Sequence, residues 1–345
     1  MVFGNSRAGI GRFEQALAHA AFSGAAISSA YLADAIYYRG DLSRAQSLSE
    51  EYLRLNRQVA PPDVVILNYR TAARLSFLNN NLDHAELMLT ELGDIGDLRD
   101  LPRLKAAAWL EKSRLALLCG DTETADRYFK LGSSPKAWAS QSAYSAYTEE
   151  IDDLLIASCR MELVLGEASK AATILETAID QANSIGRRWR KVRLQCLVSQ
   201  AYARMGKQIQ ALDKLEDALL SAAINNDVYV FADEPWCLVD LLQEILTRNK
   251  RIDNGFVSRV LERTIAQVQR MGEVSLSKSN HGLLTPKETA LLRLVAEGRA
   301  NKEIARLMNI SDNTVETHLR RINQKFETKN RTQAVTRARE AGLIR

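Results

Sequence analysis

The chain has 345 residues, enough for two or three domains of roughly 150 residues each. Apolar residues make up 46% of the sequence, aromatic residues only 6%, and proline occurs 6 times. Because Ala and Leu dominate the apolar set and are strong helix formers, this composition favours helices over sheets. No apolar run approaches the roughly 18 residues of a membrane span, and the first residues lack the order of a signal peptide. We therefore expect a cytoplasmic protein without a membrane partner.

The net charge of +4 is unevenly distributed along the chain. Residues 284–345 contain 13 Lys and Arg against 7 Asp and Glu, whereas the preceding residues contain 33 against 35. A basic end on a nearly neutral body indicates a surface that meets a polyanion.

Five segments between residues 25 and 223 share a pattern that recurs about every 40 residues. Each segment has a turn residue, an alanine five positions later and a small residue seven positions earlier. The turn residues are Gly40, Asn80, Gly120, Gly166 and Gly206. Gly and Asn adopt the left-handed conformation that ends a helix. The pattern therefore predicts five pairs of closely packed antiparallel helices, with an inserted loop at residues 132–144 and a further helix pair to about Met271.

These segments resemble tetratricopeptide-like repeats with long helices. Such repeats stack into a superhelix with a concave face that can bind a small ligand or a protein. We expect residues 1–271 to form this sensor or interaction domain; a scaffold without a ligand is the alternative. The aromatic residues on the first helices are candidates to line a ligand pocket or else belong to the core: Tyr37, Tyr38, Tyr69, Trp109 and Tyr202.

Two further stretches of this region are distinctive in composition. The basic run at residues 187–193 either binds nucleic acid or is a solvated helix face with Trp189 buried. Residues 272–282 contain Ser, Gly and Lys without a helical period, so we predict a linker there.

Residues 283–345 are predicted to form four short helices. Thr285 is a candidate N-cap, Pro286 the first helical residue and Glu288 the acid of a capping box, with Gly298 ending the helix. A second helix at about residues 301–308 is expected to place three residues inward: Ile304, Ala305 and Leu307.

The third helix of this region begins at Ser311 or Asp312, and the fourth covers about residues 331–341. In the third helix, apolar residues at helical spacing predict one core-facing stripe: Val315, Leu319, Ile322 and Phe326. Two short helices joined by a three-residue turn form the geometry in which the second helix enters the major groove of DNA.

The strings "NKEIARLMNISDNTVETHLRRINQKF" and "NRTQAV" resemble the LuxR-type (GerE-like) DNA-binding domain. This resemblance implies backbone contacts by Lys302 and Thr314, and groove contacts by Thr317, Arg320 and Arg321. It also implies that Lys325, Arg331 and Thr332 hold phosphates at the groove rim. The predicted DNA-contacting stretch also includes Val315, which matches a structural position of the family, and Glu316, where the family often has Lys. A carboxylate at residue 316 either accepts a hydrogen bond from cytosine or only repels phosphate.

A helical-repeat region followed by a LuxR-type domain resembles the C-terminal half of MalT-like regulators. In those proteins the repeats receive a small inducer and often protein antagonists, and a nucleotide-binding module precedes the repeats. The ATP-binding string G-x-x-x-x-G-K-[ST] does not occur here, so no cofactor is predicted. The chain is either a fragment of a larger regulator or a short relative.

The sequence therefore predicts an all-α transcription regulator that binds operator DNA as a dimer through its last helix, with RNA polymerase as a further candidate partner. The alternative is a protein-interaction scaffold with secondary DNA binding. An enzyme is not expected, because the four histidines lack metal-ligand spacing and no nucleophile motif occurs.

Overall fold

The computed structural model describes residues 10–11, 14–15, 22–139, 153–248, 251–280, 286–308, 310, 312–326, 328–340 and 344. All regular elements in these ranges are helices, which confirms the all-α prediction. The chain divides into two compact units, Met1–Gly272 and Glu273–Arg345. Of the helices that the structure describes, none combines the length and apolar character that crossing a bilayer requires.

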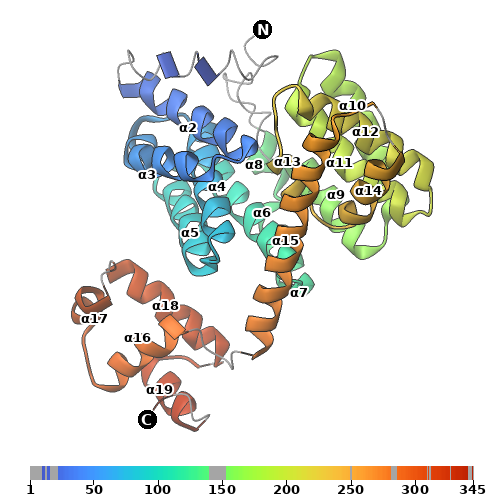
Figure 1. Ribbon diagram of the computed structural model, residues 1–345. Coiled ribbons are helices and arrows are strands. Elements are labelled where there is room, and N and C mark those ends of the chain that lie inside the picture. The colour runs from blue at the N-terminus through green and yellow to red at the C-terminus, as the bar shows by residue number, and fades with distance from the viewer. Residues whose placement is uncertain are drawn as a thin grey trace. The chain divides into compact units, whose positions relative to one another are not determined.

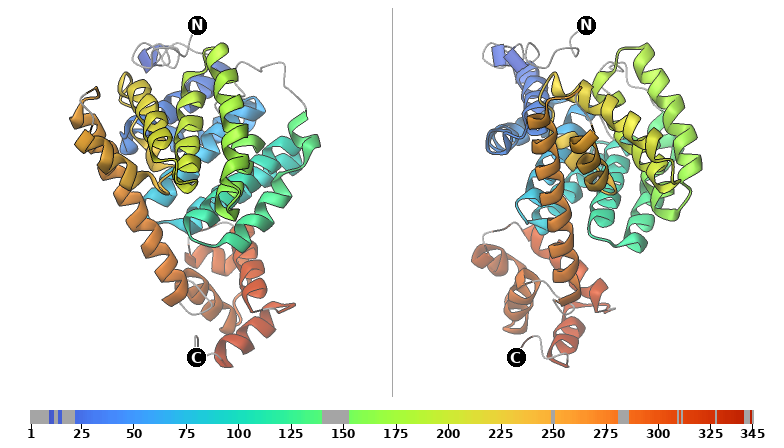
Figure 2. Two further views of the ribbon diagram at one scale, coloured as in Figure 1. Left: turned by 90° about the vertical axis from the view of Figure 1, so that its right-hand side faces the viewer. Right: turned by 45° about the vertical axis from the view of Figure 1, so that its right-hand side comes forward.

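The first unit is an array of five helical hairpins (Figure 1). Their first helices are α2 (Phe22–Arg39), α4 (Pro62–Leu78), α6 (Pro102–Leu118), α9 (Leu154–Leu165) and α11 (Arg188–Arg204). Their second helices are α3 (Leu42–Val59), α5 (Leu82–Leu98), α7 (Thr122–Gly132), α10 (Ala168–Ser184) and α12 (Gln208–Ala223). Each first helix contacts the first helix of the next hairpin, so the hairpins stack side by side (Figure 2). The predicted tetratricopeptide-like architecture is confirmed.

The turns within the hairpins have the conformation that their residue types predict. The φ angles are 91° at Gly40, 55° at Asn80, 74° at Gly120, 91° at Gly166 and 72° at Gly206, all in the left-handed region. The alanine five positions after each turn is fully buried: Ala45, Ala85, Ala125, Ala171 and Ala211. These small side chains let the two helices of each hairpin approach closely.

Two parts of the first unit differ from regular hairpins. The predicted inserted loop contains a short helix, α8 (Pro135–Ala139), and its remaining residues lie outside the described ranges. After α12, the short helix α13 (Tyr229–Ala232) precedes the predicted further helix pair, α14 (Leu238–Arg248) and α15 (Asn254–Asn280).

The linker prediction at residues 272–282 is wrong in conformation for residues 272–280, because α15 continues to Asn280. Apolar residues do not recur at helical spacing in this stretch. This indicates only that the sequence provides no apolar face for burial there, and it does not exclude a helix. Ser, Lys and Asn lower helix propensity little compared with Pro, so a helix that is already formed can extend through them. Residues 281–282 lie outside the described ranges.

The second unit contains α16 (Pro286–Ala296), α17 (Asn301–Met308), α18 (Asp312–Lys325) and α19 (Arg331–Glu340). These bounds match the predicted helices, and Gly298 after α16 has a φ of 81°. Fully buried residues from all four helices form one core: Leu291, Leu292, Ile304, Val315, Ile322, Ala334 and Ala338. Leu307 was expected to point inward but is 63% exposed, because the helical turn that buries Ile304 and Ala305 directs it to solvent.

Candidate nucleic-acid interface

Helix α18 has one buried face and one exposed face. Val315 and Ile322 are fully buried, and Leu319 and Phe326 are nearly so, which attaches the helix to the core. Glu316 and Arg320, one helical turn apart, are both exposed. The helix therefore presents a polar face, in the arrangement that a major-groove reading helix requires.

The predicted DNA-contacting residues fall into three groups by exposure. Lys302, Glu316, Arg320, Lys325 and Thr332 are exposed, and Thr317, Arg321 and Arg331 are half-buried. Thr314 is 8% exposed, so at most its edge can reach a phosphate. Val315 is fully buried, so its inclusion in the DNA-contacting stretch was wrong: a branched apolar side chain at this position packs in the core.

Two of these residues also make contacts within the unit. The Lys325 ammonium lies 2.5 Å from the Glu288 carboxylate, which is buried. Glu288 was interpreted from sequence as a capping-box acid; the structure instead pairs it with α18, and Thr285 lies outside the described residues. The Arg331 guanidinium donates to Asn301 Oδ1 at 3.4 Å and to the Arg299 carbonyl at 3.5 Å, which ties the start of α19 to the start of α17.

The five aromatic candidates for a ligand pocket do not converge on one site. Tyr69 is fully buried. Trp109 stacks on Tyr128 with ring centroids 5.3 Å apart, and the Tyr202 hydroxyl donates to Glu176 at 2.8 Å. Tyr37 and Tyr38 contact each other edge to face at 5.2 Å, and both are buried.

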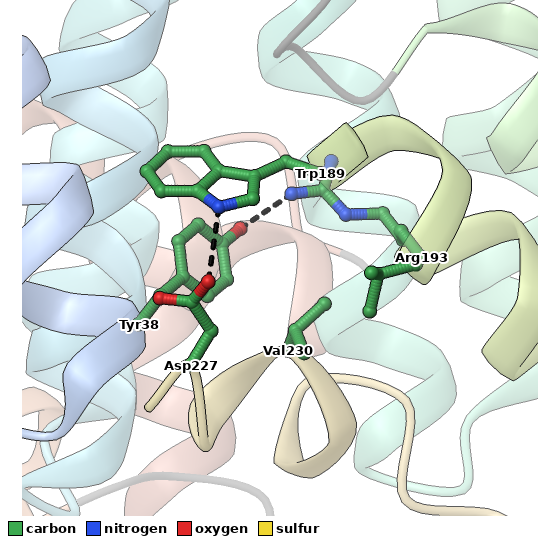
Figure 3. Close-up of a pocket in the computed structure, with 6 residues that line it drawn as sticks. Tyr38, Trp189, Arg193, Asp227 and Val230 are labelled. Atoms are coloured by element: carbon green, nitrogen blue, oxygen red, sulfur yellow. Dashed lines mark hydrogen bonds between the residues drawn. The ribbon is translucent and has the colours of Figure 1, made fainter. Parts of the chain in front are cut away.

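Of the five, Tyr38 lines a small pocket (Figure 3). The other residues of its lining are Trp189, Val192, Arg193, Asp227 and Val230. The Trp189 indole donates to the Asp227 carboxylate at 3.0 Å, and the Arg193 guanidinium donates to the Tyr38 hydroxyl at 2.6 Å. Burial raises the pKa of Tyr38 to about 12 and the pKa of Asp227 to about 6.

The basic run at residues 187–193 is largely engaged within the repeat unit. Arg190 donates to Asp153 at 2.7 Å, Lys191 donates to Asn183 at 2.9 Å, and Arg193 is buried. Trp189 is half-buried. These contacts favour a role of the run in the fold over nucleic-acid binding.

Sequence reasoning missed a segment that we call the inner strap, residues 227–236, which includes α13. Figure 1 shows α13 between the first three hairpins and the last two. Asp233 accepts from the Tyr37 hydroxyl of α2 at 2.5 Å and from the Arg74 guanidinium of α4 at 2.6 Å. Its backbone carbonyl accepts from Arg114 of α6 at 3.2 Å.

The next residue of the inner strap reaches the remaining first helices. The Glu234 carboxylate is fully buried and pairs with Arg160 of α9, whose Nε lies 2.9 Å from Oε2. The Glu234 carbonyl accepts from Gln200 of α11 at 3.1 Å. The inner strap therefore contacts the first helix of all five hairpins. We call the side of the array that these helices form the inner face. The only sequence signal was a group of acids between two predicted helix pairs.

The fold and the site define a helical-repeat protein that carries a helix-turn-helix unit. The chain belongs to the MalT-like TPR region family, whose profile matches residues 12–248. Residues 282–338 match a second family, the bacterial regulatory proteins of the luxR family. Both resemblances that the sequence motifs indicated are thereby confirmed.

Curated relatives support this assignment. The HTH-type transcriptional regulator AlkS of Ectopseudomonas oleovorans is 33% identical over 177 residues, covering 48% of this chain and 19% of the relative. The transcriptional regulatory protein DesR of Bacillus subtilis is 44% identical over 62 residues, covering 18% of this chain and 31% of the relative. The monoamine regulon transcriptional regulator of Klebsiella aerogenes is 51% identical over 55 residues, 16% of this chain and 24% of the relative. Each alignment spans less than a third of the relative's own length.

All three relatives are transcription regulators by name, a class that is not enzymatic. This agrees with the expectation that the chain is not an enzyme. LuxR-type regulators bind DNA.

Proposed function

We propose that this chain is a transcription regulator that inserts α18 into the major groove of operator DNA when the repeat unit receives a signal. One observation carries the proposal: α18 is fixed to its core by Val315 and Ile322, while Glu316 and Arg320 face away from that core. A helix held in this way is rigid and presents polar side chains to base edges.

The exposure of the predicted residues supports a division of roles within this proposal. Arg320, Arg321 and Thr317 would contact base edges and nearby phosphates, because they lie on or beside the exposed face of α18. Lys302, Arg331 and Thr332 come from the helices on either side and would hold phosphates at the groove rim. Lys325 would share its charge between a phosphate and Glu288.

We assign signal sensing to residues 1–271 and DNA binding to residues 283–345. The signal is either a small molecule or a protein partner. A single unit of this size offers a small interface, so tight binding requires two copies on half-sites about 34 Å apart. The apolar side of α19 packs into its own core, so a dimer through α19 would use the polar side of that helix. Because bacterial operators lie in the cytoplasm, we place the protein there, where RNA polymerase is a further partner.

The test begins with duplexes selected by the full chain from a random pool. The double variant Arg320→Ala, Arg321→Ala should bind a selected duplex about 10- to 100-fold more weakly, with a salt slope reduced by about one for each lost phosphate contact. The matched control is Arg293→Ala, an exposed arginine on α16 outside the two helices of the motif. Fluorescence anisotropy at several salt concentrations measures both quantities. Equal affinity and slope in the double variant and the wild type would contradict the proposal.

A further inference from the structure

When the inner strap is left out of the count, the inner face of the repeat unit carries an excess of positive charge. The five first helices bury five arginines: Arg70, Arg74, Arg114, Arg160 and Arg193. They bury three carboxylates, of which Asp63 pairs with Arg103 at 2.7 Å. Among the buried carboxylates of the first helices, Asp34 and Glu111 therefore remain to balance the charge of the five arginines.

The inner strap supplies the missing negative charge. Asp227, Asp233 and Glu234 are each less than 5% exposed, and all three make hydrogen bonds to the first helices. Buried arginines require carboxylate partners, because an unpaired charge in the interior is strongly unfavourable. A segment that covers this face must supply negative charge and hydrogen-bond acceptors, and the strap supplies both.

The inner strap also lies outside the repeat pattern. It is flanked by two non-glycine residues with left-handed backbone, Asn226 with a φ of 59° and Cys237 with a φ of 38°. Residues 228–232, which include its one short helix, are buried in the main hydrophobic core of the repeat unit, and Asp233 and Glu234 bind through side-chain ends and backbone carbonyls. Its last residue, Trp236, packs against a cluster of buried residues from α6, α7 and α9 that includes Ala116 and Met161. This is how a bound peptide lies along a helical-repeat surface, rather than how one hairpin packs on the next.

We propose that the inner face is a binding site for an acidic peptide segment of a partner protein, and that the inner strap occupies this site within the chain. The partner segment carries adjacent carboxylates, which pair with Arg74 and Arg160, followed by an aromatic residue that takes the place of Trp236. Binding of the partner displaces the strap, and the two occupants exclude each other. This inference rests on the sensing role proposed above for the repeat unit, but its test measures peptide binding and not DNA binding.

Competition within the chain sets the expected affinities. A tethered segment competes at an effective concentration on the order of millimolar or above, so the wild-type chain should bind a free peptide only weakly. Removing the strap's own carboxylates should relieve this competition, while the arginines of the inner face are unchanged. A free acidic peptide then restores the second carboxylate of Arg74, which keeps its pair with Glu111, and the carboxylate that pairs with Arg160.

The experiment uses the full chain with Asp233→Asn and Glu234→Gln, which conserve side-chain volume. The probe is a fluorescently labelled peptide with the sequence of residues 226–236, and the control probe is the same peptide with the two substitutions. In anisotropy titrations the acidic peptide should bind the variant about tenfold or more tightly than it binds the wild type, and the control peptide should bind neither chain. No binding of the acidic peptide to a variant with wild-type helicity overturns the proposal. Equal binding of both peptides also overturns it, because the face would then not select carboxylates.

A second measurement needs no variant, so it holds if the substituted chain fails to fold. Amide hydrogen exchange of residues 227–236 is measured in the wild-type chain with and without the acidic peptide at several millimolar. Displacement predicts faster exchange in the strap with the acidic peptide and no change with the control peptide. Unchanged exchange with the acidic peptide overturns the proposal.

Discussion

The inner face of the repeat unit and the exposed face of α18 both carry charged side chains, but the two surfaces differ in what surrounds the charges. On the inner face, Arg74 and Arg160 are 2–3% exposed and pair with carboxylates of the same chain. On α18, Glu316 and Arg320 are open to solvent. A buried ion pair is costly to break, whereas an exposed charge contributes little to stability. In the chain alone, charge on the inner face therefore stabilises the fold, whereas charge on α18 contributes little to stability.

The largest expected effect follows from removing one member of a buried pair. Arg160→Met should destabilise the repeat unit by ~3–5 kcal/mol, because Glu234 would be left buried without its partner. Arg320→Ala should change the free energy of unfolding by less than about 0.5 kcal/mol. Urea unfolding followed by circular dichroism measures both values. If the two variants lost equal stability, the comparison between the two surfaces would fail.

A second prediction concerns Asp227, whose pKa burial raises from 3.8 to about 6. A carboxyl with a raised folded-state pKa favours folding most below pH 4, and this contribution is lost as pH rises through 6. A pKa difference of about 2 corresponds to ~3 kcal/mol. Asp227→Asn keeps an oxygen for the Trp189 indole but does not titrate, so the repeat unit should lose less stability between pH 4 and 7.5 in this variant than in the wild type.

Urea unfolding at both pH values checks this prediction, since the other titrating groups cancel in the difference between the two chains. The charges of Arg39 and Arg188 favour the ionised form of Asp227 and limit the effect. Identical pH dependence of the two chains would show that the Asp227 carboxyl does not titrate in this range.

The smallest effect is expected at Glu316, on the exposed face of α18. Glu316→Gln should leave stability unchanged but alter the preference at one base pair by ~1–3 kcal/mol, because Glu accepts from cytosine and Gln pairs with adenine. Competition titrations with duplexes substituted at each position of a selected site measure this preference. An unaltered preference at every position would mean that Glu316 does not face a base.

Sequence predicts an element well when the residue types in it favour one local conformation or one buried face. A left-handed turn favours Gly or Asn, so Gly40, Asn80 and Gly206 mark the hairpins without knowledge of the contacts. The stripe of Val315, Leu319 and Ile322 likewise fixes which face of α18 is buried. The exposed residues of the candidate nucleic-acid interface follow from that stripe, because they occupy the remaining faces of the same helix.

The inner strap could not be predicted, because its partners are distant in sequence. Asp233 pairs with Arg74, 159 residues away, and no local periodicity encodes this contact. Glu288 shows the same difficulty in the second unit. Its position fits a capping box equally well, and its partner Lys325 lies 37 residues later. Where one residue type satisfies a local and a distant partner equally, sequence reasoning selects the local one.

The four cysteines differ in how accessible their thiols are in the folded chain. Cys119, Cys159 and Cys196 are buried, and Cys237, directly after the inner strap, is exposed. Burial also raises the pKa of Cys159 to about 12, which keeps its thiol protonated and unreactive. A thiol-directed dye should therefore label the native protein at one position and the unfolded protein at four, which allows a single fluorophore to be attached without any engineered residue.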